Sequence, residues 1–518
     1  GQRDELHDSA AVQRGVSAVK RPGKRWLWLI PCVLALAVGL FLLLRSRAAS
    51  LSAPAPSAAL LQASDGLDEI ELQAEFLPES RSLRVTQRMA LTSRVDDARD
   101  TLVLRTWPNA YQSMETSPLT LTELYDAAYP EGFSTGALVM EEATVAHGDG
   151  AAEKVFYRYT DTAKTVLSLP LAQSWGCGET LTVTLRYTLM LPKAASRYGV
   201  MDGVYAVGNA FPLPALYENG AYRTDDYSPI GDPFVSECAN FSLELTLPDG
   251  YQCAATSFPS ETRQDGERQV MTFSAPAVRD FALVLSQQFQ AVQAMEGNVL
   301  VSVYAPDGNW ARQALAFARA ALRCYNELYG DYPYPSLTLT GSTLPYDGAE
   351  YPGLCLLSSS LTGDELEKAA AHEVAHQWWY AIVGSDSVNN AWQDEALSQF
   401  SALSYWERAH GAAARAEWYE QEIAPSLRIT LNATAGAPLS WFSSLGEYKS
   451  LVYDRGTALL CAADELLGGR MNDFLRLYRE RCAFGMASRQ DFLSLLTEYS
   501  NEDFTPLFED YLDTLITP

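Results

Sequence analysis

Hydrophobic and polar positions follow three successive patterns along the chain. Residues 26–44 (WLWLIPCVLALAVGLFLLL) are uncharged and mostly apolar, and as a helix they would reach about 28 Å, close to the thickness of a bilayer core. From about 67 to 290, segments such as 181–191 (LTVTLRYTLML) alternate apolar and polar residues with the period of a β-strand. Beyond residue 300 the period becomes helical, first in 309–330.

These patterns predict a multidomain protein. The predicted parts are a cytoplasmic tail over 1–25, a transmembrane helix over 26–44, an Ala/Ser/Pro-rich linker over 45–66, an all-β domain of saddle or sandwich type over 67–290, and an α+β domain with a mainly helical C-terminal part over 291–518. A second helix-rich stretch, over 415–518, belongs to the last of these.

The apolar run has two alternative interpretations, a cleaved signal peptide and a buried core helix. The apolar region of a signal peptide is usually shorter, and a core helix seldom needs so long an apolar run. Four Lys/Arg residues lie in 20–25, whereas only Arg45 and Arg47 follow the run closely. The positive-inside rule therefore predicts a single-pass protein of the cell membrane, with its N-terminus in the cytoplasm and the body of the chain outside.

The charge of the chain limits its partners. The 518 residues carry a net charge of -26, and the part after residue 47 holds 30 Lys/Arg against 61 Asp/Glu. Such a body disfavours nucleic acid and anionic lipid, and most of these charges are expected to be a solvated surface. The eight cysteines form no CxxC pair; Cys238 and Cys253 flank a predicted turn and could pair, but buried free thiols are an equally good expectation.

The candidate chemistry lies in a predicted helix. Thr362 to Glu365 has the spacing of a capping box and is predicted to open a helix that ends near Gly384. His372 and His376 are four residues apart, so their side chains share one face and can hold one metal ion, while Glu373 can reach a metal-bound water.

A third ligand is predicted on the next helix, over about 392–407. Glu395 follows His376 with 18 residues between them, and two helices joined by a short turn can pack antiparallel. A His2Glu set with one open position is a catalytic zinc site, in which zinc lowers the pKa of bound water and Glu373 accepts its proton. A surface pattern without function is the alternative for the histidine pair, and Glu395 argues against it.

This combination resembles the gluzincin aminopeptidases, the zinc family of aminopeptidase N. The resemblance extends to Gly348-Ala349-Glu350, similar to the family's Gly-x-Met-Glu stretch with Ala349 in place of Met. It implies that Glu350, with Gly348 and Ala349 beside it, binds the free α-amino group of the substrate. It also implies that Tyr453, in a stretch similar to the family's Tyr-x-Lys-Gly, stabilises the oxyanion, with Tyr448 as a neighbouring contact.

The resemblance implies a thermolysin-like zinc metallopeptidase domain over 291–518, in a short form that lacks the family's large C-terminal helical domain. The expected protein is a membrane-anchored zinc aminopeptidase that holds one Zn²⁺ per chain and acts on peptides with a free N-terminus. Two alternatives stay open: a zinc endopeptidase or processing enzyme on the same fold, and a membrane-tethered binding protein without turnover. The preferred N-terminal residue, the physiological substrate and the oligomeric state are left open.

Overall fold

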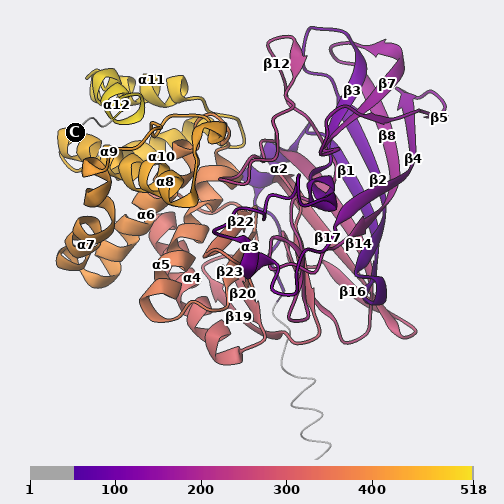
Figure 1. Ribbon diagram of the computed structural model, residues 1–518, viewed down its shortest axis with the longest axis horizontal. Helices are drawn as coiled ribbons and strands as arrows, with labels where there is room; N and C mark the ends of the chain where they lie inside the picture. The colour runs from indigo at the N-terminus through magenta and orange to yellow at the C-terminus, as the bar shows by residue number, and fades with distance from the viewer. Residues whose placement is uncertain (1–51, 516–518) are drawn as a thin grey trace, which may run out of the picture. The chain divides into compact units, whose positions relative to one another are not determined.

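The computed structural model describes residues 52–515 as one compact unit (Figure 1). The predicted transmembrane helix over 26–44 lies outside these residues. Within 52–515, every helix is too short or too polar to cross a bilayer.

The N-terminal part is β-rich, as its alternating pattern predicts, and is built on one eight-stranded sheet (Figure 1). The strand order is β16-β17-β14-β1-β2-β8-β4-β5, and only β1 and β14 pair in parallel. In β8, every second side chain from Leu181 to Leu189 is buried, because one face of the sheet carries the core. The bounds are β1 (Glu69–Leu77), β2 (Ser82–Thr92), β4 (Ala137–His147), β5 (Glu153–Lys154), β8 (Thr180–Met190), β14 (Ala239–Pro248), β16 (Glu261–Asp265) and β17 (Arg268–Val278).

Three smaller sheets complete this part. Their orders are β15-β18-β10-β9, β11-β3-β7-β6 and β12-β13. The bounds are β3 (Arg99–Arg105), β6 (Arg158–Tyr159), β7 (Val166–Trp175), β9 (Tyr198–Met201), β10 (Val204–Val207), β11 (Leu213–Pro214), β12 (Tyr217–Glu218), β13 (Ala221–Tyr222), β15 (Gln252–Ala255) and β18 (Leu283–Ser286). Cys238 and Cys253 are buried free thiols, so the disulfide considered for them is not formed.

The second part begins with a five-stranded sheet of order β19-β20-β21-β23-β22. Its strands are β19 (Gln290–Glu296), β20 (Val299–Ala305), β21 (Ser336–Ser342), β22 (Gly348–Tyr351) and β23 (Leu354–Ser358). The central three run in parallel, whereas β22 is an antiparallel edge strand. Helix α4 (Gly308–Tyr329) packs on β19 and β20, and its neighbour α5 (Gly363–Ala375) contacts β22 and β23.

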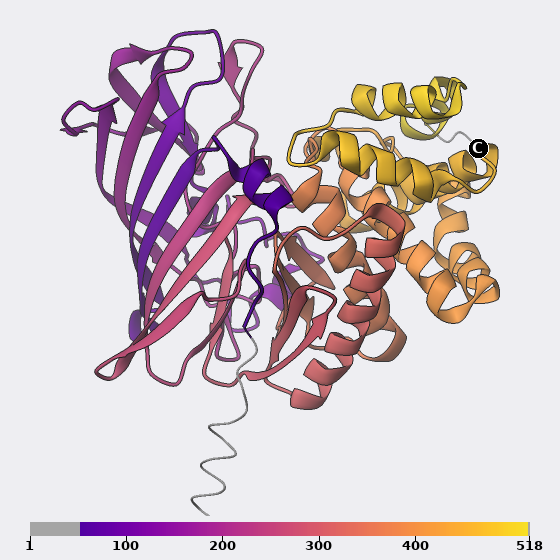
Figure 2. The ribbon, with the colours of Figure 1, turned by 180° about the vertical axis from the view of Figure 1, so that it is seen from behind.

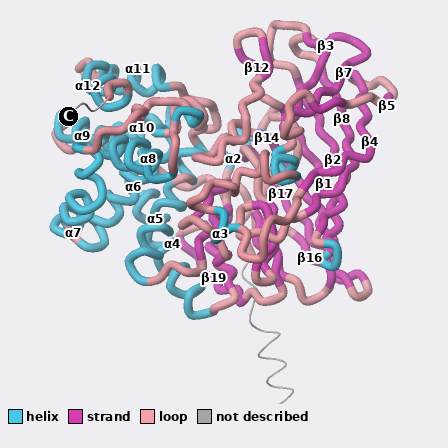
Figure 3. The backbone as a smooth tube through the Cα atoms, viewed as in Figure 1, coloured by secondary structure: helices cyan, strands magenta, loops and turns pink. Residues whose placement is uncertain are grey.

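The remaining C-terminal region is helical, as predicted (Figures 2 and 3). It contains α6 (Trp392–His410), α7 (Ala412–Trp418), α8 (Leu445–Tyr448), α9 (Gly456–Leu466), α10 (Met471–Cys482), α11 (Arg489–Ser500) and α12 (Thr505–Leu512). Short π-helical or 3-10 segments lie between them: η4 (Gln377–Ile382), η5 (Tyr419–Ile423), η6 (Ala424–Arg428), η7 (Leu439–Trp441) and η8 (Lys449–Arg455). In the N-terminal part lie α2 (Ala58–Ser64), α3 (Tyr125–Ala128), η2 (Pro78–Ser80) and η3 (Trp107–Gln112).

The helix of the histidine pair differs from its prediction at both ends. Thr362 is the N-cap residue of α5, but its side chain accepts no capping hydrogen bond. The helix does not continue to Gly384: regular α-helix ends at Ala375, and Trp379 and Tyr380 have non-helical backbone angles within η4. The sequence does not indicate this bend, because an apolar run could equally continue a buried helix; Trp378 and Trp379 are core residues of the bent segment.

Candidate metal centre and substrate pocket

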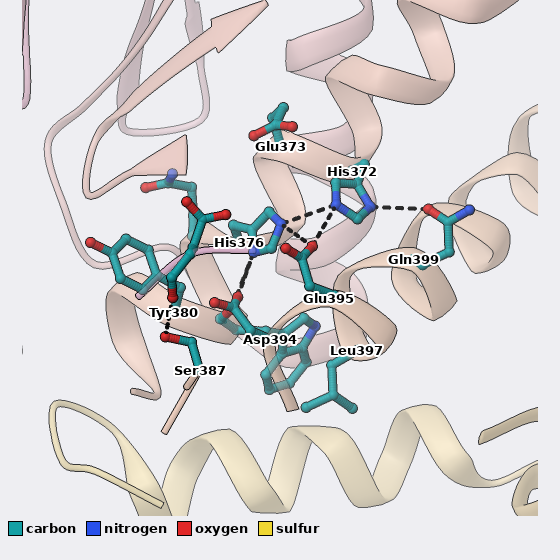
Figure 4. Close-up of polar contacts among 12 residues, drawn as sticks. His372, Glu373, His376, Tyr380, Ser387, Asp394, Glu395, Leu397 and Gln399 are labelled. Carbon is teal, nitrogen blue, oxygen red and sulfur yellow. Dashed lines mark hydrogen bonds and ion pairs between the residues drawn. The ribbon is translucent and has the colours of Figure 1, made fainter. Parts of the chain in front are cut away.

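Helices α5 and α6 pack against each other and bring the three predicted ligands together (Figure 4). His372 Nε2 lies 3.0 Å from His376 Nε2 and 3.3 Å from Glu395 Oε2, and His376 Nε2 lies 3.4 Å from the same oxygen. Tetrahedral ligands at the usual zinc distance of about 2.1 Å are themselves about 3.4 Å apart. The three atoms therefore have the spacing of a zinc site.

The outer nitrogen of each ring supports this interpretation. His372 Nδ1 donates to Gln399 Oε1 at 3.0 Å, and His376 Nδ1 donates to Asp394 Oδ1 at 2.6 Å. With a proton on each Nδ1, both Nε2 atoms point lone pairs at Glu395 and at each other. Three lone pairs that converge in this way repel one another unless a cation lies between them, so the donor set fits Zn²⁺.

The electrostatics of Glu395 and Glu373 differ, although both are buried. Burial favours the neutral form of Glu395, but the adjacent His372 and His376 rings, which attract the carboxylate when they are protonated, outweigh that effect and hold its pKa far below the usual value. Burial raises the pKa of Glu373 to about 8, against the pull of the nearby His376 ring. Glu373 Oε2 is buried without a hydrogen-bond partner among the described residues, which leaves this oxygen available to a water or substrate proton.

The segment around Glu350 forms the rim of the site. A Cβ at Gly348 would overlap the Glu373 carboxylate, so this glycine is needed for Glu373 to take its position. Glu350 is only 7 % exposed, and no hydrogen bond or ion pair to its carboxylate is found within residues 52–515. One oxygen of Glu350 lies within 4.8 Å of ligand atoms of Glu373 and His376. Ala349 is completely buried in an apolar cluster, so its side chain does not face the pocket.

Burial of Glu350 has an electrostatic consequence. Its pKa lies well above the usual value because burial, reinforced by the negative charge of Asp232, disfavours the ionised form. An approaching cation would remove that penalty, since it would supply the opposite charge that the site lacks.

Tyr453 lies on the open side of the ligands. Its ring stacks on His372 with centroids 5.5 Å apart and an interplanar angle of 16°, and its side chain lines the pocket. Burial and the charge of Glu395 hold its pKa well above the usual value, so it keeps its phenolic proton as a hydrogen-bond donor. Tyr448 packs against Tyr453 at 5.7 Å and also lines the pocket.

The pocket has a volume of about 820 Å³, enough for a short peptide, and both parts of the chain line it. The floor includes His372, Glu373 and the exposed face of α5 toward its N-terminus, whereas Tyr227 and Asp232 come from a loop of the β-rich part. Asp232 pairs with Arg197 at 2.5 Å, and the Arg197 guanidinium lies over Phe234 and Tyr346.

Four of these residues are not predicted from the sequence. Asp394 precedes Glu395 directly, and one step along a helix turns a side chain by 100°, so Asp394 reaches the far side of His376; this neighbouring acid was a usable signal. Gln399 lies one turn further along α6 and was also within reach of helical reasoning. Arg197 and Asp232 lie in loops far from the motif, where no local pattern marks them.

The fold and the donor set are those of zinc metallopeptidases with the His-Glu-x-x-His arrangement. The structure superposes on an M1 zinc metallopeptidase from Deinococcus radiodurans with a TM-score of 0.59 and 16% sequence identity, over 87% of this chain and 94% of that one. Residues 322–511 match the Peptidase family M1 domain. This match confirms the resemblance over residues 322–511 and implies a catalytic zinc ion.

Three curated relatives agree with this assignment. Aminopeptidase N from Lactobacillus helveticus is 26% identical over 320 residues, which is 55% of this chain and 36% of that protein. Aminopeptidase N from Acetobacter pasteurianus is 24% identical over 181 residues (31% and 51%), and leukotriene A-4 hydrolase from Xenopus laevis is 27% identical over 207 residues (38% and 33%). The chain thus spans only about a third to a half of the length of these proteins.

Proposed function

We propose that the protein is a zinc aminopeptidase, which removes single residues from the N-termini of peptides. The observation that carries this proposal is the Glu350 carboxylate, which is buried without a partner among the described residues, within 4.8 Å of Glu373 and His376 atoms. A buried carboxylate is stabilised by a bound ammonium group and penalises any substrate that lacks one. By binding the N-terminal ammonium group, Glu350 would therefore place the first peptide bond of the substrate at the metal.

His372, His376 and Glu395 would hold the zinc ion, which when bound polarises the scissile carbonyl and activates water. Glu373 takes up a proton at its unpartnered Oε2 and returns it to the leaving amine. Tyr453 keeps its proton and donates a hydrogen bond to the oxygen on which negative charge develops.

The edge strand β22 supports the binding mode. In its sheet β22 pairs with β23 alone among the described strands, so its other edge can pair with an extended peptide. A peptide bound there by its main chain would be held next to Glu350 and Glu373 whatever its side chains are. Its leaving part would then follow the pocket along α5, where Glu365 and Lys368 line it.

The test is hydrolysis of an aminoacyl amide by the zinc-loaded protein, compared with Glu373→Gln. We expect turnover by the wild type and a loss of at least about 10³-fold in kcat for the variant, because general-base catalysis typically contributes 10²–10⁴-fold. If wild type and Glu373→Gln bind zinc equally and neither hydrolyses any peptide, the protein is a binding protein instead. Cleavage of N-acetylated peptides as fast as free ones would favour an endopeptidase.

We further propose that residues 26–44 anchor the protein in the cell membrane, with the catalytic part on the outer side. The length of the apolar run and the excess of Lys/Arg before it support this proposal. The full chain should sediment with membranes, resist extraction with alkaline carbonate and dissolve in detergent. A chain that begins at Ser52 should stay in the supernatant; equal partition of both chains would contradict the proposal.

A further inference from the structure

Arg279 is a buried cation at the point where the two parts of the chain meet. It directly follows β17, and only 2 % of its surface is exposed. Within residues 52–515, no carboxylate oxygen lies within 4.0 Å of its guanidinium. A buried charge without a counter-ion is unfavourable unless hydrogen bonds replace those to water, so the acceptors of Arg279 require an explanation.

Four of its five acceptors are main-chain carbonyl groups from three separate segments, and the fifth is Met486 Sδ, 3.2 Å from Nη1. Nε donates to Tyr380 O at 2.8 Å, Nη1 donates to Ser236 O at 3.0 Å, and Nη2 donates to Gly485 O at 2.5 Å and Ile382 O at 3.5 Å. Only arginine has five N–H groups in a rigid planar fork, which can bind acceptors in several directions at once. The side chain therefore joins these three segments at fixed distances.

The first segment is the chain that leaves the zinc helix. Because Trp379 and Tyr380 leave helical geometry, the carbonyl of Tyr380 lies outside the helical hydrogen-bond ladder and accepts from Arg279 instead. His376, four residues earlier, is the C-cap of α5, and its Nδ1 lies 3.4 Å from Trp379 O. Arg279 thus holds the backbone that orients the second histidine ligand.

The second segment is the pocket wall from the β-rich part. Ser236 is bound twice, since its carbonyl accepts from Arg279 and its hydroxyl donates to Arg279 O at 2.7 Å. Four residues earlier, Asp232 lines the pocket and acts electrostatically on Glu350. Gly231, beside it, fits so closely against Tyr448 that a Cβ would lie 2.9 Å from its hydroxyl oxygen. A shift of this loop would therefore change the pocket next to the metal.

Gly384, two residues after Ile382 in the first segment, leaves room for the guanidinium and connects this segment to the third. A Cβ at Gly384 would overlap the central carbon and both terminal nitrogens of the Arg279 guanidinium, so glycine is required at this position. The backbone around it is fixed by hydrogen bonds from Gly384 N to Gly485 O at 3.0 Å and from Ala487 N to Gly384 O at 2.7 Å. The space beside Gly384 is thus shaped for the guanidinium.

We propose that Arg279 is a positioning residue of the metal centre, which fixes the His376 end of the zinc helix and the Asp232 wall of the pocket in one geometry. The expected effect of Arg279 on zinc affinity follows from the geometry of the ligands and needs no assumption about the reaction. The expected effect of Arg279 on substrate binding rests on the proposed aminopeptidase function. Arg279 contacts neither the metal ligands nor the substrate pocket, and acts only through the backbone of the two segments.

The experiment compares Arg279→Lys and Gly384→Ala with the wild type. Lysine keeps the charge but cannot span the carbonyls, and alanine at 384 displaces the guanidinium while Arg279 is retained. Arg223→Met is the matched control, because Arg223 also joins the β-rich part to this connecting segment, but through an ion pair with Asp386 at 3.1 Å. The measurements are the zinc Kd by chelator competition, KM and kcat for an aminoacyl amide at saturating zinc, and the Tm.

We expect Arg279→Lys and Gly384→Ala to raise the zinc Kd by about tenfold or more, as loss of an outer-shell partner does. Both should also raise KM, whereas Arg223→Met stays within twofold of wild type in both. A lower Tm with unchanged zinc Kd and KM in the folded variants would overturn the proposal. If Arg279→Lys does not fold, the zinc Kd of Gly384→Ala tests the proposal by itself. If the wild type hydrolyses no amide, the proposed function fails, but the zinc Kd series still decides the role of Arg279.

Discussion

Removal of the carboxylate of Asp394 tests how the protein sets the affinity of its metal site. The change is Asp394→Ala, which deletes the 2.6 Å hydrogen bond to His376 Nδ1 in a site where Asp394 is 3 % exposed. Without this partner His376 can rotate and can carry its proton on Nε2, the atom that should bind zinc.

The expected magnitude follows from the kind of bond that is lost. A hydrogen bond to a charged group contributes about 1.5–3 kcal/mol, which corresponds to a zinc Kd raised about 10- to 100-fold. Asp394→Asn keeps an oxygen acceptor and loses only the charge, so we expect about a fivefold effect. Gln399→Ala, which deletes a neutral bond of 3.0 Å to His372, should also cost about 1 kcal/mol, again about fivefold.

The assay is equilibrium competition for zinc between each variant and a chelator of known affinity. Glu447→Ala is the control, because Glu447 is also a buried carboxylate (6 % exposed) but accepts from Ser443 N at 2.8 Å rather than from a histidine. We expect the order Asp394→Ala, then Asp394→Asn and Gln399→Ala, with the control at the wild-type value. A zinc Kd for Asp394→Ala within twofold of wild type would refute this reasoning.

Three further outcomes are expected. Tyr453→Phe should lower kcat about 10²-fold with KM changed less than threefold, because the lost hydrogen bond forms mainly in the transition state; a rise in KM alone would contradict this role. Gly348→Ala should lower kcat at least about tenfold, since its methyl group displaces the Glu373 carboxylate; wild-type kinetics would show that Glu373 has room to move. In zinc-free protein, the pKa of Glu373 is about 8 in the folded state but about 4.3 in the unfolded state. The folded state therefore binds the proton more tightly, and this contribution to the free energy of unfolding is lost as the pH rises from about 4.3 to about 8. Glu373→Gln should therefore become the more stable protein as pH rises from 4.3 to 8, by up to about 5 kcal/mol; parallel denaturation curves at all pH values would contradict the raised pKa.

The parts of the site that follow helical geometry were predictable from the sequence. The four-residue spacing of His372 and His376 dictates a shared face, and a second helix after a short turn places Glu395 opposite them. The alternating period likewise predicted the strands of the β-rich part, such as β8. These features depend on the spacing of residues within one helix or strand, which can be read directly from a single sequence.

The rest depends on contacts between distant segments. The bend at Trp379 and Tyr380 lies in an apolar stretch that could continue a helix, and it is fixed by a guanidinium 101 residues earlier in the chain. The pocket wall at Asp232 and Arg197 is a loop whose position depends on the packing of the β-rich part against the zinc domain. Local propensity contains no information on such pairings, which is why the pocket was not predictable although its ligands were.

The central claim is that Glu350 makes this metal site an aminopeptidase site. The most direct measurement is the ratio of kcat/KM for one peptide with a free N-terminus and the same peptide N-acetylated, with zinc-loaded wild type and Glu350→Gln. An unpaired buried charge costs about 3–5 kcal/mol, so we expect the wild type to prefer the free peptide by at least about 100-fold and the variant to lose most of this preference. Equal cleavage of the two peptides by the wild type would contradict the claim.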